Sequence, residues 1–133
     1  MKAYLLDTMT VLRMTFLPKK LGAEAAKILQ TEEPSLWYSA AAIWEIGIRM
    51  SIGGYQDLAL PGDWNHHLIT ELEKQRIHCL EIAPKYCQAL QELDQHHRDP
   101  FDRMMIAQAK TENLIIIGSD QKFDQYEVPR IWD

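Results

Sequence analysis

Short apolar runs alternate along the chain with longer stretches of helical periodicity. The apolar runs lack the regular polar positions of a half-exposed strand, and they predict buried strands over residues 3–6, 36–38, 77–82, 113–120 and 128–132. The stretches between them are rich in helix formers, and they predict helices over residues 11–16, 22–33, 40–50, 61–76, 84–95 and from 100 to at least 109. Strands and helices therefore alternate from one end of the chain to the other.

This alternation predicts an α/β fold. Strands without polar alternation are buried on both faces, so we expect a three-layer α/β/α sandwich with a central parallel sheet. In such sheets, ligands bind beyond the carboxyl ends of the strands. Asp7 follows the first predicted strand, and Asp120 ends the fourth long one. We therefore expect the chemistry of this protein at that edge of the sheet.

Length and composition fit one ordinary domain. The chain has 133 residues, of which 47% are hydrophobic, and we assign residues 1–133 to a single domain with its own core. No apolar run approaches the roughly 18–20 residues of a membrane helix. The first apolar stretch ends at Asp7, too early for a signal peptide. We therefore expect a cytoplasmic protein that does not enter a membrane.

Cysteines, histidines and charge exclude some classes of site. Cys79 and Cys87 are not at C-x-x-C spacing and are expected to be reduced. No histidine pairs with a cysteine at zinc-finger spacing, so we expect no structural zinc. The formal net charge of -5 argues against a protein that holds duplex DNA by charge alone. It is compatible with an acidic metal pocket and with a basic protein partner.

The stretch HHRDPFDRMMIAQA, residues 96–109, has two interpretations. Pro100 suits the first position of a helix, with Asp99 as N-cap and Asp102 in the first turn. Each acid then stabilises the helix N-terminus by roughly 0.3–1 kcal/mol, which needs no further function. However, Asp102 shares one helical face with Met105 and Ile106. A carboxylate at the edge of a buried face is costly, which favours a functional role.

Three other acids are also ambiguous. Glu45 lies in the apolar segment AIWEIGI, where it either occupies a solvent-exposed stripe beside Arg49 or points inward at a cation. Asp7 can simply cap the following helix. Asp120 can begin a turn in GSDQKF.

The predicted sheet brings four of these acids to one edge: Asp7, Glu45, Asp102 and Asp120. Two unit charges about 4 Å apart repel by roughly 4 kcal/mol at an effective dielectric of about 20. Such a cluster is expected only with a bound divalent cation, and ligation by oxygen atoms alone selects Mg²⁺ or Mn²⁺. One or two such ions commonly support the hydrolysis of phosphate esters.

The four acids lie in segments that resemble, in order and spacing, those of PIN-domain ribonucleases: YLLDT, YSAAAIWEIGIRMSIG, HHRDPFDRMMIAQA and IIIGSD. More narrowly, the chain is similar to the VapC-type toxins of bacterial toxin–antitoxin pairs. The resemblance covers essentially the whole chain, and RDPFDRMMIAQA is its most specific part. It implies an α/β/α sandwich, a metal-dependent endoribonuclease and a homodimer. It also implies a cognate antitoxin, whose tail occupies the active site.

Residue by residue, the resemblance assigns metal binding and catalysis to the same four acids, Asp7, Glu45, Asp102 and Asp120. Asp99 matches the first acid of RDPFD, and we expect it to support the site without binding metal. Asp124 is the alternative to Asp120 as the fourth acid, because the region after the last long strand varies in such proteins.

The chain departs from its relatives at positions near these acids. Met9 stands where many relatives have a histidine, and Arg13 stands where a tryptophan is common. Gly118 replaces the threonine of the usual TAD, which leaves Ser119 to supply any hydroxyl. None of these departures removes an acid, so they bear on substrate positioning and rate.

The reaction that we hypothesise is cleavage of accessible single-stranded RNA. Water attacks the phosphorus in line and leaves a 5′-phosphate and a 3′-hydroxyl. Thr8 or Ser119 could orient the water or the phosphate. His96, His97 and Arg98 could hold the RNA backbone, or they could form a solvated polar loop.

Three alternatives belong to other classes of protein. A phosphatase with an aspartyl nucleophile needs a second aspartate two residues after Asp7, where Met9 stands. A phospho-acceptor receiver domain needs an acid pair after its first strand, and YLLDT offers one acid. The stronger alternative is a catalytically silent PIN-fold module that binds its antitoxin or RNA without cutting.

Overall fold

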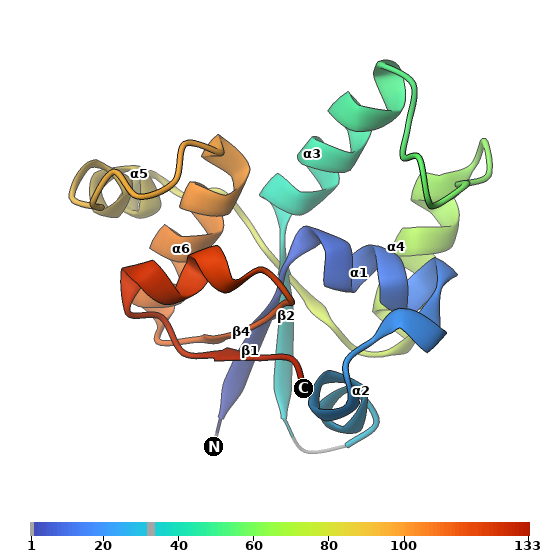
Figure 1. The fold of residues 1–133 in the computed structure, drawn as a ribbon, viewed down its shortest axis with the longest axis horizontal. Helices are drawn as coiled ribbons and strands as arrows, with labels where there is room; N and C mark the ends of the chain where they lie inside the picture. Colours follow the sequence, from blue (N-terminus) through green and yellow to red (C-terminus); the bar gives the residue numbers. More distant parts are fainter. Residues whose placement is uncertain (1, 32–33) are drawn as a thin grey trace.

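A five-stranded parallel sheet forms the centre of the molecule in the computed structural model, which describes residues 2–31 and 34–133 (Figure 1). Its strands are β1 (Ala3–Leu6), β2 (Ser35–Ser39), β3 (His78–Leu80), β4 (Ile115–Ile117) and β5 (Arg130–Ile131), in the order β3-β2-β1-β4-β5. The central strand β1 pairs with β2 on one side and with β4 on the other. Because all pairs are parallel, the chain leaves every strand at the same edge of the sheet.

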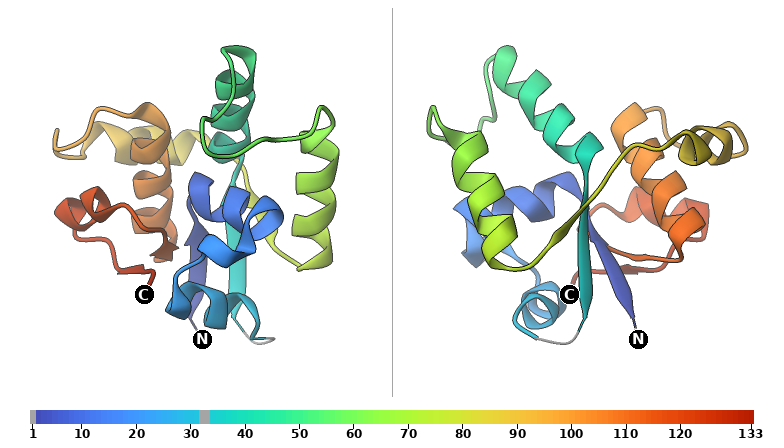
Figure 2. Two further views of the ribbon diagram at one scale, coloured as in Figure 1. Left: turned by 45° about the vertical axis from the view of Figure 1, so that its right-hand side comes forward. Right: turned by 180° about the vertical axis from the view of Figure 1, so that it is seen from behind.

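Helices cover both faces of this sheet, as predicted. One face carries α1 (Thr8–Phe16), α2 (Ala23–Leu29) and α4 (Trp64–Lys74), and the other carries α5 (Pro84–Gln91) and α6 (Pro100–Glu112) (Figures 1 and 2). The helix α3 (Ala40–Ser51) continues from the carboxyl end of β2 and projects beyond the sheet edge. Two short 3-10 helices complete the fold, η1 (Pro18–Lys20) and η2 (Gln121–Tyr126). The result is a three-layer α/β/α sandwich.

Within residues 2–31 and 34–133, no helix is long and apolar enough to cross a bilayer.

Two apolar cores lie on the two faces of the sheet. Successive residues of a strand point to opposite faces, so Leu6 packs in the core beneath α1 and α4, and Leu5 packs in the core beneath α6. The helix α3 enters both cores, since Ile46 belongs to the first and Ala42 to the second. This double anchoring fixes the position of Glu45, which directly precedes Ile46.

Several elements differ in length from the sequence-based predictions. The helix α1 begins at Thr8, earlier than predicted, because Asp7 caps it. The strands predicted over 77–82 and 113–120 reduce to the three residues of β3 and of β4. Their partner strands end at Ser39 and Leu6, where the chain turns into helices, so pairing stops there.

Three helical segments also differ from the predictions. The helix α2 ends at Leu29, and residues 32–33 of the predicted helix lie outside the described residues. The helix α5 ends at Gln91, short of the predicted 95. The 3-10 helix η2 was not predicted from the sequence. Both cysteines are free, as predicted.

Candidate metal centre

Asp7 lies at the carboxyl end of β1 and is the N-cap of α1. Its backbone N–H donates to the carbonyl of Ile117 at 3.0 Å, which joins it to β4. Its Oδ1 accepts from the Thr10 N–H at 2.9 Å and from Thr10 Oγ1 at 2.6 Å. Burial raises the pKa of Asp7 to about 6, although the Thr10 hydrogen bonds and the charge of Arg13 lower it. Asp7 therefore caps α1, and the same hydrogen bonds hold its buried carboxylate in place.

Gly118 lies against the carboxylate of Asp7. A Cβ atom at this position would overlap with Asp7 Oδ2 and Cγ. The glycine lets the carboxylate lie directly against the backbone that follows β4. The departure from threonine noted in the sequence is therefore coupled to the orientation of the first acid.

Glu45 reaches the same edge from α3. It accepts a hydrogen bond from Thr8 Oγ1 at 2.6 Å, which connects α3 to the first turn of α1. Burial raises the pKa of Glu45 to about 7, and the nearby charges of Asp99, Asp102 and Asp7 add to this shift. The alternative partner, Arg49, instead lies over the ring of Tyr55, 5.2 Å from its centroid.

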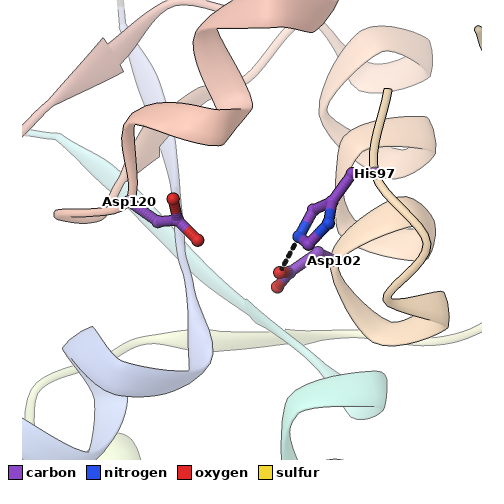
Figure 3. A group of neighbouring side chains, drawn as sticks. All are labelled: His97, Asp102 and Asp120. Atoms are coloured by element: carbon purple, nitrogen blue, oxygen red, sulfur yellow. Dashed lines mark hydrogen bonds and ion pairs between the residues drawn. The ribbon is translucent and has the colours of Figure 1, made fainter. Parts of the chain in front are cut away.

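Asp102 occupies the first turn of α6, as the sequence predicts. Asp99 is the N-cap of this helix and accepts from the N–H groups of Phe101 at 2.9 Å and Asp102 at 3.2 Å. Asp102 Oδ2 lies 2.7 Å from His97 Nε2, and both side chains are mostly buried (Figure 3). Burial raises the pKa of Asp102, while His97 opposes this shift.

Asp120 joins this pair from the loop after β4. It caps η2 by accepting from the Lys122 N–H at 2.9 Å, so the turn interpretation is also correct. Its carboxylate points toward Asp102 and His97 (Figure 3). One ligand atom each of His97, Asp102 and Asp120 lies within 4.8 Å of the others.

Asp124, the alternative fourth acid, has a different environment. Its two carboxylate oxygens accept from Arg130 Nε at 2.9 Å and from a terminal nitrogen of Arg130 at 3.0 Å. This bidentate ion pair lowers the pKa of Asp124. Asp124 is exposed and neutralised, whereas Asp120 faces the other acids.

The remaining predicted residues occupy varied positions. Thr8 bonds Glu45, as described above. The hydroxyl of Ser119 accepts from the guanidinium of Arg13 at 3.2 Å. The ring of His96 packs edge-on against Tyr126, 5.3 Å between centroids, and Arg98 is exposed.

Two side chains with roles at this edge were missed from the sequence. The sequence predicts His97 as either an RNA contact or part of a solvated polar loop, and in the structure its ring hydrogen-bonds Asp102. It lies in a loop, where no periodicity rule predicts that a side chain folds back onto the helix. Thr10 was not singled out, although a hydroxyl three residues after a capping aspartate is a recognisable N-terminal signal.

The donor set at this edge fits a hard divalent cation. Asp7, Glu45 and Asp102 all have raised pKa values, because each is desolvated and each lies near other acids. A cation among them would remove this cost. Carboxylate oxygens are the preferred donors for Mg²⁺ and Mn²⁺. His97 fits the role of an outer residue that orients a ligand carboxylate.

Known structures share this fold across almost their whole length. The chain superposes on a chain of VapBC2 from Rickettsia felis, a complex bound to a promoter DNA fragment, with a TM-score of 0.72, 15% identity, and coverage of 98% of this chain and 99% of that one. For DNA-bound VapBC from Salmonella typhimurium the TM-score is 0.67, with 16% identity and 98% of both chains covered. For FitAcB from Neisseria gonorrhoeae the values are 0.60, 20% and 96% of both chains.

The comparison of sequences gives the family. No curated protein matches the chain significantly. The family model of the PIN domain matches residues 4–129. This match spans nearly the whole chain and includes all four acids, and the fold agrees with it. The chain belongs to the PIN-domain family.

Proposed function

We propose that this protein is a metal-dependent endoribonuclease and the VapC-type toxin of a toxin–antitoxin pair. PIN domains are in general nucleases, and the structural relatives are VapBC and FitAB complexes. The observation that carries the proposal is the group of acids at one sheet edge: ligand atoms of Asp102, Asp120 and His97 lie within 4.8 Å of one another, and the charge of Asp102 acts on both Asp7 and Glu45, whose pKa values are raised. On this proposal, residues 1–133 form one PIN domain.

The four acids would hold one or two Mg²⁺ or Mn²⁺ ions, and Asp120 rather than Asp124 would be the fourth ligand. When bound, such an ion lowers the pKa of water and stabilises the charge that develops on a phosphate. Asp99 supports the site by fixing the start of α6. His97 orients Asp102 through the bond at Nε2.

The chain's own groups then position the reactants and move protons. Thr8 directs the Glu45 carboxylate toward the site through its hydroxyl. A carboxylate of the site that lies beside the water can accept its proton. Water attacks the phosphorus and the bond to the 3′-oxygen breaks, so the products are a 5′-phosphate and a 3′-hydroxyl.

The proposal includes partners. A cognate antitoxin would neutralise the toxin by placing its tail over the acidic edge, and the active form would be a homodimer. The cytoplasm, where RNA and antitoxin are present, would be the site of action. The RNA sequence that is cut is set by loops and surface shape, and the acids do not specify it.

RNA cleavage by the purified chain tests this function. We expect wild-type protein to cut single-stranded RNA with Mg²⁺ or Mn²⁺, to lose activity in EDTA, and to leave 5′-phosphate ends. Glu45→Gln should reduce cleavage by roughly 100-fold or more while keeping the fold, because it removes one charged ligand. Arg49→Gln on the same helix is the matched control. If no RNA is cut with either metal, the alternative of a silent binding module replaces the proposal.

A further inference from the structure

An RNA substrate must approach an edge of the molecule that is crowded with carboxylates. The chain as a whole has a formal net charge of -5. A polyanionic substrate is repelled by such a surface unless cations lie beside it. Three arginines contact the loops that carry these acids: Arg13 bonds Ser119, Arg103 bonds the carbonyl of His97, and Arg130 bonds the carbonyl of Gly118.

Two of these arginines are committed to acceptors of the protein. Arg130 donates to both oxygens of Asp124 and to the carbonyl of Gly118 at 2.9 Å. Arg103 donates to three backbone carbonyls and to the hydroxyl of Tyr126. Their guanidinium groups are used to hold loops together.

Arg13 differs from both. Within residues 2–31 and 34–133 it donates one hydrogen bond, to the hydroxyl of Ser119 at 3.2 Å. Its guanidinium lies over the ring of Trp132, 5.3 Å from the centroid, where the chain after β5 returns beside α1 and α2 (Figures 1 and 2). The ring and the hydroxyl fix the group without neutralising it, so most of its N–H donors stay available.

Arg13 is also next to the acidic edge. Its charge acts on Asp7, and its partner Ser119 directly precedes Asp120. Ser119 and Trp132 both line a cavity of about 360 Å³, whose other walls are two acids, a cation, an amide and an apolar side chain: Glu24, Asp133, Arg130, Gln121 and Ile131. That volume lies within the range of small-ligand sites. An aromatic ring, an amide and a hydroxyl are groups that contact nucleosides in proteins that bind single strands.

We propose that Arg13 binds the phosphate next to the scissile phosphate on the same RNA strand. The cavity beside Ser119 and Trp132 then receives the nucleoside attached to that phosphate. This inference rests on the proposed function, because it names where the substrate of that site is held. Arg13 is then a substrate-binding residue and not a ligand of the metal.

RNA binding in the absence of cleavage tests the proposal. We would measure the fluorescence anisotropy of a labelled 12-nucleotide single-stranded RNA of mixed sequence, in EDTA and at several KCl concentrations. Arg13→Gln should weaken binding about tenfold, since a charged hydrogen-bonding pair is lost. The slope of log Kd against log salt should fall by about 0.7, the value for one phosphate contact on a single strand. Arg13→Lys should keep the slope, because it keeps the charge.

Lys19→Gln is the matched control. Lys19 is exposed on η1, and its loss changes the net charge equally, so it should leave affinity and slope unchanged. Circular dichroism would verify that each variant is folded. Equal binding by wild type, Arg13→Gln and Lys19→Gln would overturn the proposal, and so would the absence of RNA binding by wild type.

The two proposals fail in distinguishable ways. Loss of binding in Arg13→Gln, combined with no metal-dependent cleavage by wild type, would support the RNA site and contradict the nuclease. Metal-dependent cleavage combined with unchanged binding in Arg13→Gln would support the nuclease and contradict the RNA site.

Discussion

The acidic edge has two halves that are built differently. In the inner half, Asp7 and Glu45 each accept a hydrogen bond from a threonine hydroxyl of α1, from Thr10 and Thr8 respectively. In the outer half, Asp102 takes its contact from His97, which lies in a loop, and Asp120 takes its contact from a backbone N–H of η2. The inner acids are thus held by the turn from β1 into α1. The outer acids depend on two segments that meet only in the folded protein.

The two halves also differ in how costly it is to ionise their carboxylates and in how close their ligand atoms lie. The inner acids have pKa values raised to about 6 and about 7, so the fold holds them where ionisation is costly. The outer pair has its ligand atoms within 4.8 Å of each other and of His97. A cation bound between the halves would offset the cost of ionising Asp7 and Glu45. The same cation could be bound by carboxylate oxygens of Asp102 and Asp120. We therefore test the outer half by its effect on RNA cleavage and the inner half by its effect on the pH dependence of stability.

The largest effects are expected on RNA cleavage, and the outer half offers a matched pair of acids with which to measure one. Asp120→Asn should reduce Mn²⁺-dependent RNA cleavage by at least about 100-fold, because it removes a charged oxygen ligand from the group. Asp124→Asn is its matched control, four residues along the same segment. It breaks an exposed ion pair with Arg130, so we expect a change of less than about fivefold. A larger loss in Asp124→Asn than in Asp120→Asn would exchange the roles of the two acids.

A smaller effect concerns the inner half and stability. Because the folded-state pKa of Asp7 is raised to about 6 from 3.8, the native state binds its proton more tightly than the unfolded state does. This contribution is fully present below pH 4 and is lost as the pH rises through about 6. Glu45 acts in the same direction up to about pH 7. The metal-free protein should therefore lose stability between pH 5 and pH 8, by roughly 1–2 kcal/mol for Asp7 alone.

Urea unfolding in EDTA at these two pH values measures this loss. Asp7→Asn should make the dependence shallower, since only the contribution of Glu45 remains, and it should be more stable than wild type at pH 8. Mn²⁺ should restore the stability of wild type at pH 8 but not that of Asp7→Asn. A wild-type stability that stays constant or rises from pH 5 to pH 8 would contradict this account of the inner half.

Much of this molecule follows from local sequence. The parallel sheet and the helices on both faces follow from the alternation of apolar runs with helical stretches, and the start of α6 follows from the Asp99, Pro100 and Asp102 spacing. The prediction that Asp7 and Asp120 belong to the site follows from the rule that ligands bind beyond the carboxyl ends of parallel strands. These features depend on residues that are neighbours in the chain.

The features that could not be predicted depend on how the folded chain brings side chains together, both within loops and between distant segments. The contact of His97 with Asp102 needs the loop before α6 to fold back. The fit of Gly118 against Asp7 needs β1 and β4 to be adjacent. The sequence leaves Asp124 as an alternative to Asp120, and the structure distinguishes them, because Asp124 pairs with Arg130 whereas Asp120 lies near Asp102 and His97. Local patterns contain no information about such pairings.

The central claim is that the four acids form one divalent-cation site, and a calorimetric titration of Mn²⁺ into the metal-free chain tests it most directly. We predict saturable binding to wild type, weakened more than about tenfold in Glu45→Gln and unchanged in Arg49→Gln. Binding that is absent from wild type, or equally strong in Glu45→Gln, would contradict the claim and leave these carboxylates as helix caps.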